Sequence, residues 1–168
     1  MKLQFIILIL FAAIACTRQV PQLPANKSTT TDSVGLAIQA INQRLIVGED
    51  SVLEAYVQKK KLGVVKTSSG LWLKIEKNTE GEKLKDLESC KIHYRILSLA
   101  DSLLLEKTET IIIGKKQVIN GIEKALLQMN KGEEATALIP WYLGYGMKGN
   151  GNEIPPYTSI IVRLHLLN

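Results

Sequence analysis

The chain has 168 residues, of which 46% are hydrophobic and 22% are charged, and its formal net charge at pH 7 is +5. This composition is close to that of globular proteins, and it excludes both a wholly disordered chain and a polytopic membrane protein. Outside the run Lys59–Lys61 the lysines are scattered, with no basic stripe interleaved with aromatic residues. We therefore expect no nucleic-acid partner.

The first sixteen residues have the pattern of an export signal. Lys2 precedes an apolar run from Leu3 to Ile14, which is shorter than the roughly 20 residues that span a bilayer. Ala13-Ile14-Ala15-Cys16 resembles a lipobox, the site at which bacteria lipidate a cysteine and cleave before it. We predict a lipoprotein signal peptide over residues 1–15 and lipidation at Cys16. An ordinary signal peptide with an incidental cysteine is the alternative.

The next two segments differ sharply in composition. Residues 16–33 are rich in Pro, Ser and Thr, which is typical of a flexible linker. Over residues 34–63, apolar residues recur at helical intervals, and Gly48–Ser51 offers a break and an N-cap, so two helical segments are predicted. This N-terminal helical extension packs against the domain that follows or, alternatively, forms a homodimer or binds another partner.

Residues 64–168 have the pattern of one α+β domain. Short alternating segments predict strands of a largely antiparallel sheet. One amphipathic helix interrupts them, with Asn120 predicted as its N-cap and Glu123 as its capping-box partner. Cys90 is predicted to be a buried strand residue. The predicted strands are 71–77, 89–97, 103–106, 109–113, 133–139 and 158–167.

Four segments of this domain resemble the FKBP-type peptidyl-prolyl cis-trans isomerase family in order and spacing. They are I-H-Y from Ile92, I-G-K-K-Q-V-I-N-G-I-E-K-A-L-L-Q-M-N-K-G-E-E-A from Ile113, I-P-W-Y-L-G-Y-G from Ile139 and I-P-P from Ile154. With the preceding helix and Ser69-Gly70-Leu71, the chain is similar to FKBP lipoproteins, including gliding-associated ones, of Bacteroidetes-type bacteria. The resemblance implies a twisted antiparallel β-sheet wrapped around one short helix, with an apolar pocket between them and no cofactor.

The resemblance also implies the residues of a proline-binding pocket. Tyr94 lines it, the Ile119 backbone N–H contacts the ligand, and the Tyr145 hydroxyl donates to a substrate carbonyl, so these three are the predicted catalytic residues. Tyr94, Val118 and Ile119 fit ordinary core positions equally well. The predicted substrate-binding residues are Leu104, Val118, Ile122, Ile154 and Val162.

Several of these positions depart from the family pattern. Ile122 stands where the family has a tryptophan on the pocket floor, and Val162 stands where it has a phenylalanine on the last strand. The family's Phe-Asp pair aligns near Leu104, Leu105 and Glu106, and the bulge that follows is shortened. We therefore expect an aliphatic pocket and weak isomerase activity.

The predicted function is folding assistance for exported proteins in the cell envelope, by isomerisation of proline peptide bonds. The expected partners are proline-containing unfolded or exported polypeptides and the membrane, through the lipid, with attachment to the outer membrane facing the periplasm. The alternatives are a non-catalytic FKBP-fold chaperone or binding module and an accessory lipoprotein of an envelope machine. No metal site is predicted, because His93 and His165 lack cysteine or carboxylate partners at metal-ligand spacing.

Overall fold

The computed structural model describes residues 29–167 of the chain, which divide into one unit up to Ile41 and a second from Asn42 onward. The described part of the first unit is the beginning of helix α2 (Thr29–Lys60), and the second unit holds the rest of this helix and all strands. The predicted signal peptide, Cys16 and most of the predicted linker lie outside the described residues. The linker prediction is wrong at residues 29–33, which are helical. Within residues 29–167, no helix is long and apolar enough to cross a membrane.

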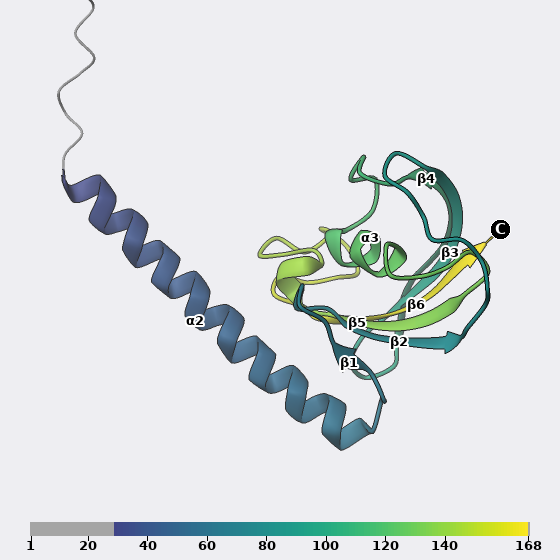
Figure 1. Ribbon diagram of the computed structural model, residues 1–168. Helices are drawn as coiled ribbons and strands as arrows, with labels where there is room; N and C mark the ends of the chain where they lie inside the picture. The colour runs from purple at the N-terminus through teal and green to yellow at the C-terminus, as the bar shows by residue number, and fades with distance from the viewer. Residues whose placement is uncertain (1–28, 168) are drawn as a thin grey trace, which may run out of the picture. The chain divides into compact units, whose positions relative to one another are not determined.

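Helix α2 is continuous, so the predicted break at Gly48–Ser51 is wrong (Figure 1). Glycine in a helix interior costs about 1 kcal/mol relative to alanine. Packing outweighs this cost, because Leu53 is fully buried on the sheet. The Ser51 hydroxyl caps nothing and donates to the Val47 carbonyl at 3.1 Å, within the helix. Lys59 and Lys60 occupy the last turn.

Six antiparallel strands form one sheet in the order β1-β2-β5-β6-β3-β4, which confirms the predicted FKBP-like fold class. The two strands predicted at 103–106 and 109–113 are one long strand, which pairs with β3 along its length. Two exposed residues form β1, too few for an alternating pattern to predict. The strands are β1 (Val65–Lys66), β2 (Trp72–Lys77), β3 (Ser89–Leu97), β4 (Leu103–Ile112), β5 (Glu134–Ile139) and β6 (Ile160–Leu167).

The short helix α3 (Asn120–Leu126) lies in the curve of the sheet (Figure 1). Its N-cap is Ile119, and no side chain caps it, so the predicted capping box is wrong. The Glu123 carboxylate instead accepts a hydrogen bond from the Gly114 backbone N–H, which ties the helix to the loop after β4. Gly121 brings the helix close to β5, since a Cβ there would overlap the Ile139 side chain.

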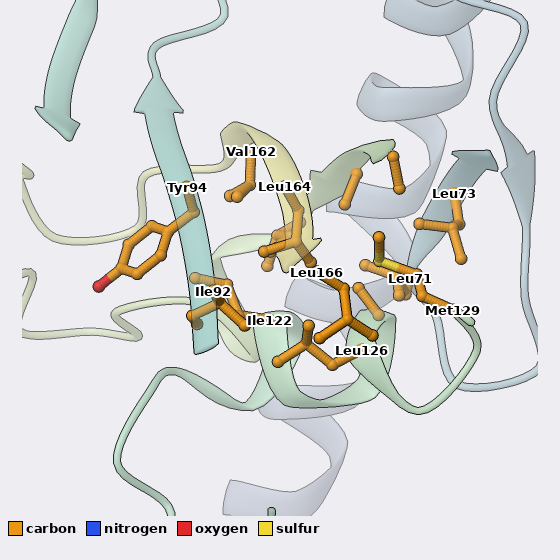
Figure 2. Close-up of a cluster of buried hydrophobic side chains, with 14 of the residues drawn as sticks. Leu71, Leu73, Ile92, Tyr94, Ile122, Leu126, Met129, Val162, Leu164 and Leu166 are labelled. Carbon is orange, nitrogen blue, oxygen red and sulfur yellow. The ribbon is translucent and has the colours of Figure 1, made fainter. Parts of the chain in front are cut away.

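Two hydrophobic clusters lie on opposite faces of the sheet. The inner cluster joins α3 to the sheet and includes Ile92, Leu126 and Leu166 (Figure 2), and Cys90 is buried in it as predicted. The outer cluster is smaller, and in it Leu53 of α2 packs with Trp72 and Ile161. The second half of α2 therefore shares a core with the sheet.

Candidate functional site

All eight predicted pocket residues belong to the inner cluster or pack against it. Figure 2 shows Tyr94 of β3, Ile122 of α3 and Val162 of β6, with the Tyr94 ring directed away from the other labelled side chains. Ile154 is buried in the same cluster from the loop before β6. Partly buried residues that pack against this cluster complete the set: Leu104, Val118, Ile119 and Tyr145.

The polar end of the site is a pair formed by Tyr94 and Glu109. The Tyr94 hydroxyl donates to Glu109 Oε1 at 2.8 Å, and Lys107 Nζ lies 2.5 Å from Glu109 Oε2. Burial raises the pKa of Tyr94 well above its usual value, and the bond to the carboxylate raises it further. Burial alone would raise the pKa of Glu109, but the bonds from Lys107 and Tyr94 outweigh it and hold that pKa below the usual carboxyl value. The pair is therefore a neutral phenol and a carboxylate at neutral pH.

Glu109 is a site residue that the sequence reasoning missed. The family alignment places the acidic position near Glu106, but Glu106 pairs opposite Arg95 and its carboxylate lies 3.0 Å from His93 Nε2. Glu109 pairs opposite the buried Ile92 and so belongs to the inner face. In one continuous strand the side chains alternate between the two faces, and this alternation would have placed Glu109 on the inner face. The sequence analysis predicted two separate strands, so the alternation could not be carried from one to the other.

The loop after β5 presents Tyr145. This loop contains the 3₁₀ turn η1 (Trp141–Leu143), and it closes where the Gly146 N–H donates to the Trp141 carbonyl at 2.8 Å. Tyr145 is half-buried, and burial, followed by the charges of Glu153 and Glu109, raises the pKa of its hydroxyl. The hydroxyl therefore keeps its proton at neutral pH and can donate to a carbonyl.

Helix α2 holds this loop through two adjacent acidic residues. The Tyr142 hydroxyl donates to Asp50 Oδ1 at 2.9 Å, and Lys66 Nζ lies 2.8 Å from Asp50 Oδ2. Ser159 Oγ accepts from the Trp141 N–H at 2.9 Å and donates to the Glu49 carboxylate. Burial and the bond to Asp50 raise the pKa of Tyr142. Residues that were predicted to interrupt the helix instead anchor it beside Tyr145.

The aliphatic replacements form a closed floor. Ile122 and Val162 are 1% and 0% exposed, so both fill space inside the cluster and leave little surface for a ligand. Leu104 lies where the register of β3 and β4 shifts, between the pairs Leu97↔Leu103 and Ile96↔Leu105. The Ile119 carbonyl accepts the first hydrogen bonds of α3, which orients the Val118-Ile119 segment at the helix start.

The described residues provide no metal centre. No three His, Cys, Asp or Glu side chains among residues 29–167 are arranged to hold an ion. His93 and His165 face each other across β3 and β6 on the outer face of the sheet, away from Tyr94. The inner cluster itself brings together apolar side chains with the hydroxyl of Tyr94 and the carboxylate of Glu109.

Comparisons with curated proteins find similar peptidyl-prolyl cis-trans isomerases. A probable FKBP-type peptidyl-prolyl cis-trans isomerase of Haemophilus influenzae is 32% identical over 106 residues, which are 61% of this chain and 44% of that protein. FKBP-type peptidyl-prolyl cis-trans isomerase FkpA of Buchnera aphidicola is 34% identical over 109 residues, which are 63% of this chain and 45% of that protein. The chain therefore spans less than half the length of these curated relatives.

Solved structures show the same fold. A peptidyl-prolyl cis-trans isomerase from Pseudomonas syringae superposes with a TM-score of 0.59 at 21% identity, covering 77% of this chain and 90% of that one. The N-terminal domain of FKBP42 from Arabidopsis thaliana gives a TM-score of 0.54 at 22% identity, covering 58% of this chain and 84% of that one. The sequence profile of FKBP-type peptidyl-prolyl cis-trans isomerases matches residues 80–167, just over half of the chain. This protein is a member of the FKBP-type peptidyl-prolyl cis-trans isomerase family.

Proposed function

We propose that this protein catalyses cis-trans isomerisation of proline peptide bonds in unfolded, exported polypeptides, with weak activity. The observation that carries the proposal is the meeting of Tyr94, Ile119 and Tyr145 at one apolar cluster, from three separate segments of the chain. Membership of the family supports the same reaction.

The reaction needs an environment rather than a reactive group. Rotation about the bond before proline is slow, because amide resonance imposes a barrier of roughly 18–20 kcal/mol. In the twisted amide this resonance is lost and the carbonyl is less polar, so a water-poor apolar wall stabilises the transition state relative to the planar amide. The protonated Tyr145 hydroxyl holds the substrate carbonyl while the bond rotates.

The altered floor sets the expected level of activity. Ile122 and Val162 offer less wall area to a proline ring than aromatic side chains do. Glu109 supplies a carboxylate beside Tyr94, which keeps the polar end of the pocket ordered. We therefore expect proline to bind with reduced complementarity and turnover to be slow but measurable.

An isomerisation assay on residues 17–168 tests the proposal, using short peptides that vary the residue before proline. Uncatalysed isomerisation takes about tens to hundreds of seconds. We expect the protein to shorten this time, and we expect Tyr145→Phe to catalyse the reaction more slowly. A folded protein that accelerates none of the peptides would contradict the enzyme proposal.

A second candidate function is binding without catalysis. The nearly complete burial of Ile122 and Val162 favours it, because it closes the floor against a ligand. In that case the protein would suppress aggregation of an unfolded client equally well with and without the Tyr145→Phe substitution. Isomerisation of the same client that depends on Tyr145 would instead support the enzyme.

Attachment to the cell envelope through Cys16 is part of the proposal. The lipobox-like Ala13–Cys16 sequence supports it, and the outer membrane facing the periplasm is the proposed location. Labelling cells with radioactive palmitate should mark the full-length chain and leave Cys16→Ser unlabelled. Labelling of both proteins would place the lipid elsewhere, and labelling of neither would favour an ordinary signal peptide.

We also propose that α2 joins two copies of the chain. Val34, Ile38 and Ile41 follow intervals of four and three residues, the spacing of a coiled-coil seam, and each is at least 54% exposed. Ile41→Lys should convert a dimer to a monomer in sedimentation equilibrium. Leu36→Lys, at an exposed position outside this seam, should leave the dimer intact. A monomeric unsubstituted chain would refute the dimer.

A further inference from the structure

A hollow of about 480 Å³ separates the middle of α2 from the loops that flank Tyr145. We call it the α2 groove. Its volume lies in the range of about 300–1,000 Å³ that small-ligand sites occupy. A Cβ added at Gly48 would meet nothing within 4 Å, so this position leaves the helix side of the groove open. The lining residues are Arg44, Leu45, Gly48, Glu49 and Val52 of the helix and Trp141 and Tyr157 of the loops.

The far wall of the groove is aromatic. The rings of Trp141 and Tyr157 meet edge to face, with centroids 5.0 Å apart. Tyr157 is 50% exposed, and Val52 on the opposite wall is 60% exposed. Exposed apolar surface on two facing walls is what a large side chain would cover on binding.

Backbone hydrogen bonds join the loops that line the groove to the segment that carries Tyr145. The Tyr157 N–H donates to the Gly146 carbonyl at 3.0 Å, and the Gly146 N–H donates to the Trp141 carbonyl at 2.8 Å. Trp141 and Tyr157, the two residues of the aromatic wall, are therefore both bonded to Gly146, which follows Tyr145. Ile154, three positions before Tyr157, is buried in the inner cluster. One loop thus contributes to the pocket and to the groove.

We infer that the α2 groove binds an aromatic or large aliphatic side chain of the same polypeptide whose proline occupies the pocket. This inference rests on the proposed function and specifies its substrate: an unfolded segment with an apolar residue a few positions from proline. An extended chain advances about 3.3–3.6 Å per residue. The distance from pocket to groove therefore fixes how many residues separate the proline from the apolar residue. Arg44 also lines the groove, and its guanidinium can donate to a carbonyl of the passing backbone.

A single side chain fits this groove better than a second copy of the protein. Specific interfaces between proteins bury at least about 1,000 Å² in total, whereas one aromatic side chain buries about 150–250 Å². The groove has seven lining residues, and α2 is already packed on the sheet through Leu53. The occupant is therefore a short stretch of client chain.

The test uses residues 17–168 and a series of ten-residue peptides with one proline. In each peptide a single phenylalanine stands two to five positions before or after proline, and alanine replaces it in the reference peptide. We expect kcat/KM to rise about tenfold over the reference at one spacing, through a lower KM, because the groove adds binding energy.

Tyr157→Asn removes the aromatic wall and suits the left-handed backbone of this residue, whose φ is 55°. This variant should lose the preference for the favoured spacing. Val52→Asn, which alters the opposite wall, should weaken the same preference. Val47→Asn is the matched control, since Val47 is a 55% exposed valine of the same helix outside the groove. It should retain the preference.

Equal kcat/KM for all spacings, or a preference that survives both groove substitutions, would overturn the inference and leave the isomerase proposal standing. If no peptide is isomerised, the isomerase proposal fails. The binding of the same peptides, now carrying a fluorescent label, is then measured by fluorescence anisotropy and tests the groove alone. Tight binding at one spacing that Tyr157→Asn abolishes would support the groove. Binding that is independent of phenylalanine would refute it.

Discussion

The Tyr94 hydroxyl donates a 2.8 Å hydrogen bond to Glu109, which lies three residues beyond the acid that the family alignment favours. Glu106 lies on the other face of β4, beside His93. The register shift between β3 and β4 lies at Leu104, and beyond it Glu109 falls on the inner face of β4 and Glu106 on the outer face. The carboxylate that accepts from Tyr94 therefore comes from another position of β4 than the one that the resemblance indicates.

Glu109→Gln should lower kcat/KM for proline peptides by about a factor of ten, because a hydrogen bond to a charged group contributes about 1.5–3 kcal/mol and part of it persists with an amide. Glu106→Gln removes a carboxylate from the same strand on the opposite face and should leave kcat/KM unchanged. Equal effects of the two substitutions in a protease-coupled assay would show that Glu109 has no special role.

Glu109 should also give stability a dependence on acid pH. Its pKa is lowered in the folded state, so its contribution is present above the unfolded-state carboxyl value of about 4.3 and is lost as the pH falls through the folded-state pKa. Urea unfolding of the wild type and of Glu109→Gln should therefore differ by a constant free energy near pH 7 and converge below about pH 4. A difference in the free energy of unfolding that grows as the pH falls would contradict the prediction.

Gly121→Ala should destabilise the protein by about 1–3 kcal/mol, the usual cost of forcing a methyl group into a filled core. The added Cβ would overlap Ile139 and push α3 away from β5. Because the Val118-Ile119 segment directly precedes α3, the displacement should also lower the isomerase rate. Thermal unfolding and the peptide assay measure the two effects, and an unchanged melting temperature would contradict the close approach.

Gly48→Ala should have the opposite effect and stabilise the protein by about 0.5–1 kcal/mol, because alanine is the better residue in a helix interior. Nothing lies within 4 Å of the added Cβ. Destabilisation of the alanine variant in urea unfolding would indicate that the helix is broken at this point.

Tyr142 and Asp50 should be energetically coupled. A double-mutant cycle of Tyr142→Phe and Asp50→Asn should give a coupling free energy of about 1 kcal/mol, reduced from a fully buried value because both side chains are only partly buried. The same cycle measured on kcat/KM tests whether the helix also positions the Tyr145 loop. Additive effects on stability would mean that the helix is not docked through this bond.

The sequence was most informative where patterns are local. Alternation located β3 at its observed ends, and the capped-helix pattern located α3 but misassigned its cap, because the Glu123 carboxylate found a partner across the loop at Gly114. The break at Gly48–Ser51 was predicted from local propensity, whereas the helix continues because Glu49 and Asp50 bond to residues about a hundred positions away.

Only part of the candidate site could be predicted from the sequence. Motifs identified Tyr94, Ile119 and Tyr145, which meet at the inner cluster. Glu109 could not be identified without the register of β4, because its face depends on pairing with β3. The α2 groove depends on two segments far apart in the sequence, and no local pattern encodes their approach.

The burial of Leu53 against the outer face of the sheet has a practical consequence for the stability of the whole chain. Removing the helix would uncover a row of four apolar side chains, Trp72, Leu138, Ile161 and Leu97, that pair across neighbouring strands. An uncovered row of this kind promotes aggregation. A protease that cuts near Lys61 would therefore yield a sheet prone to precipitate, so the lifetime of the domain depends on the integrity of its helix.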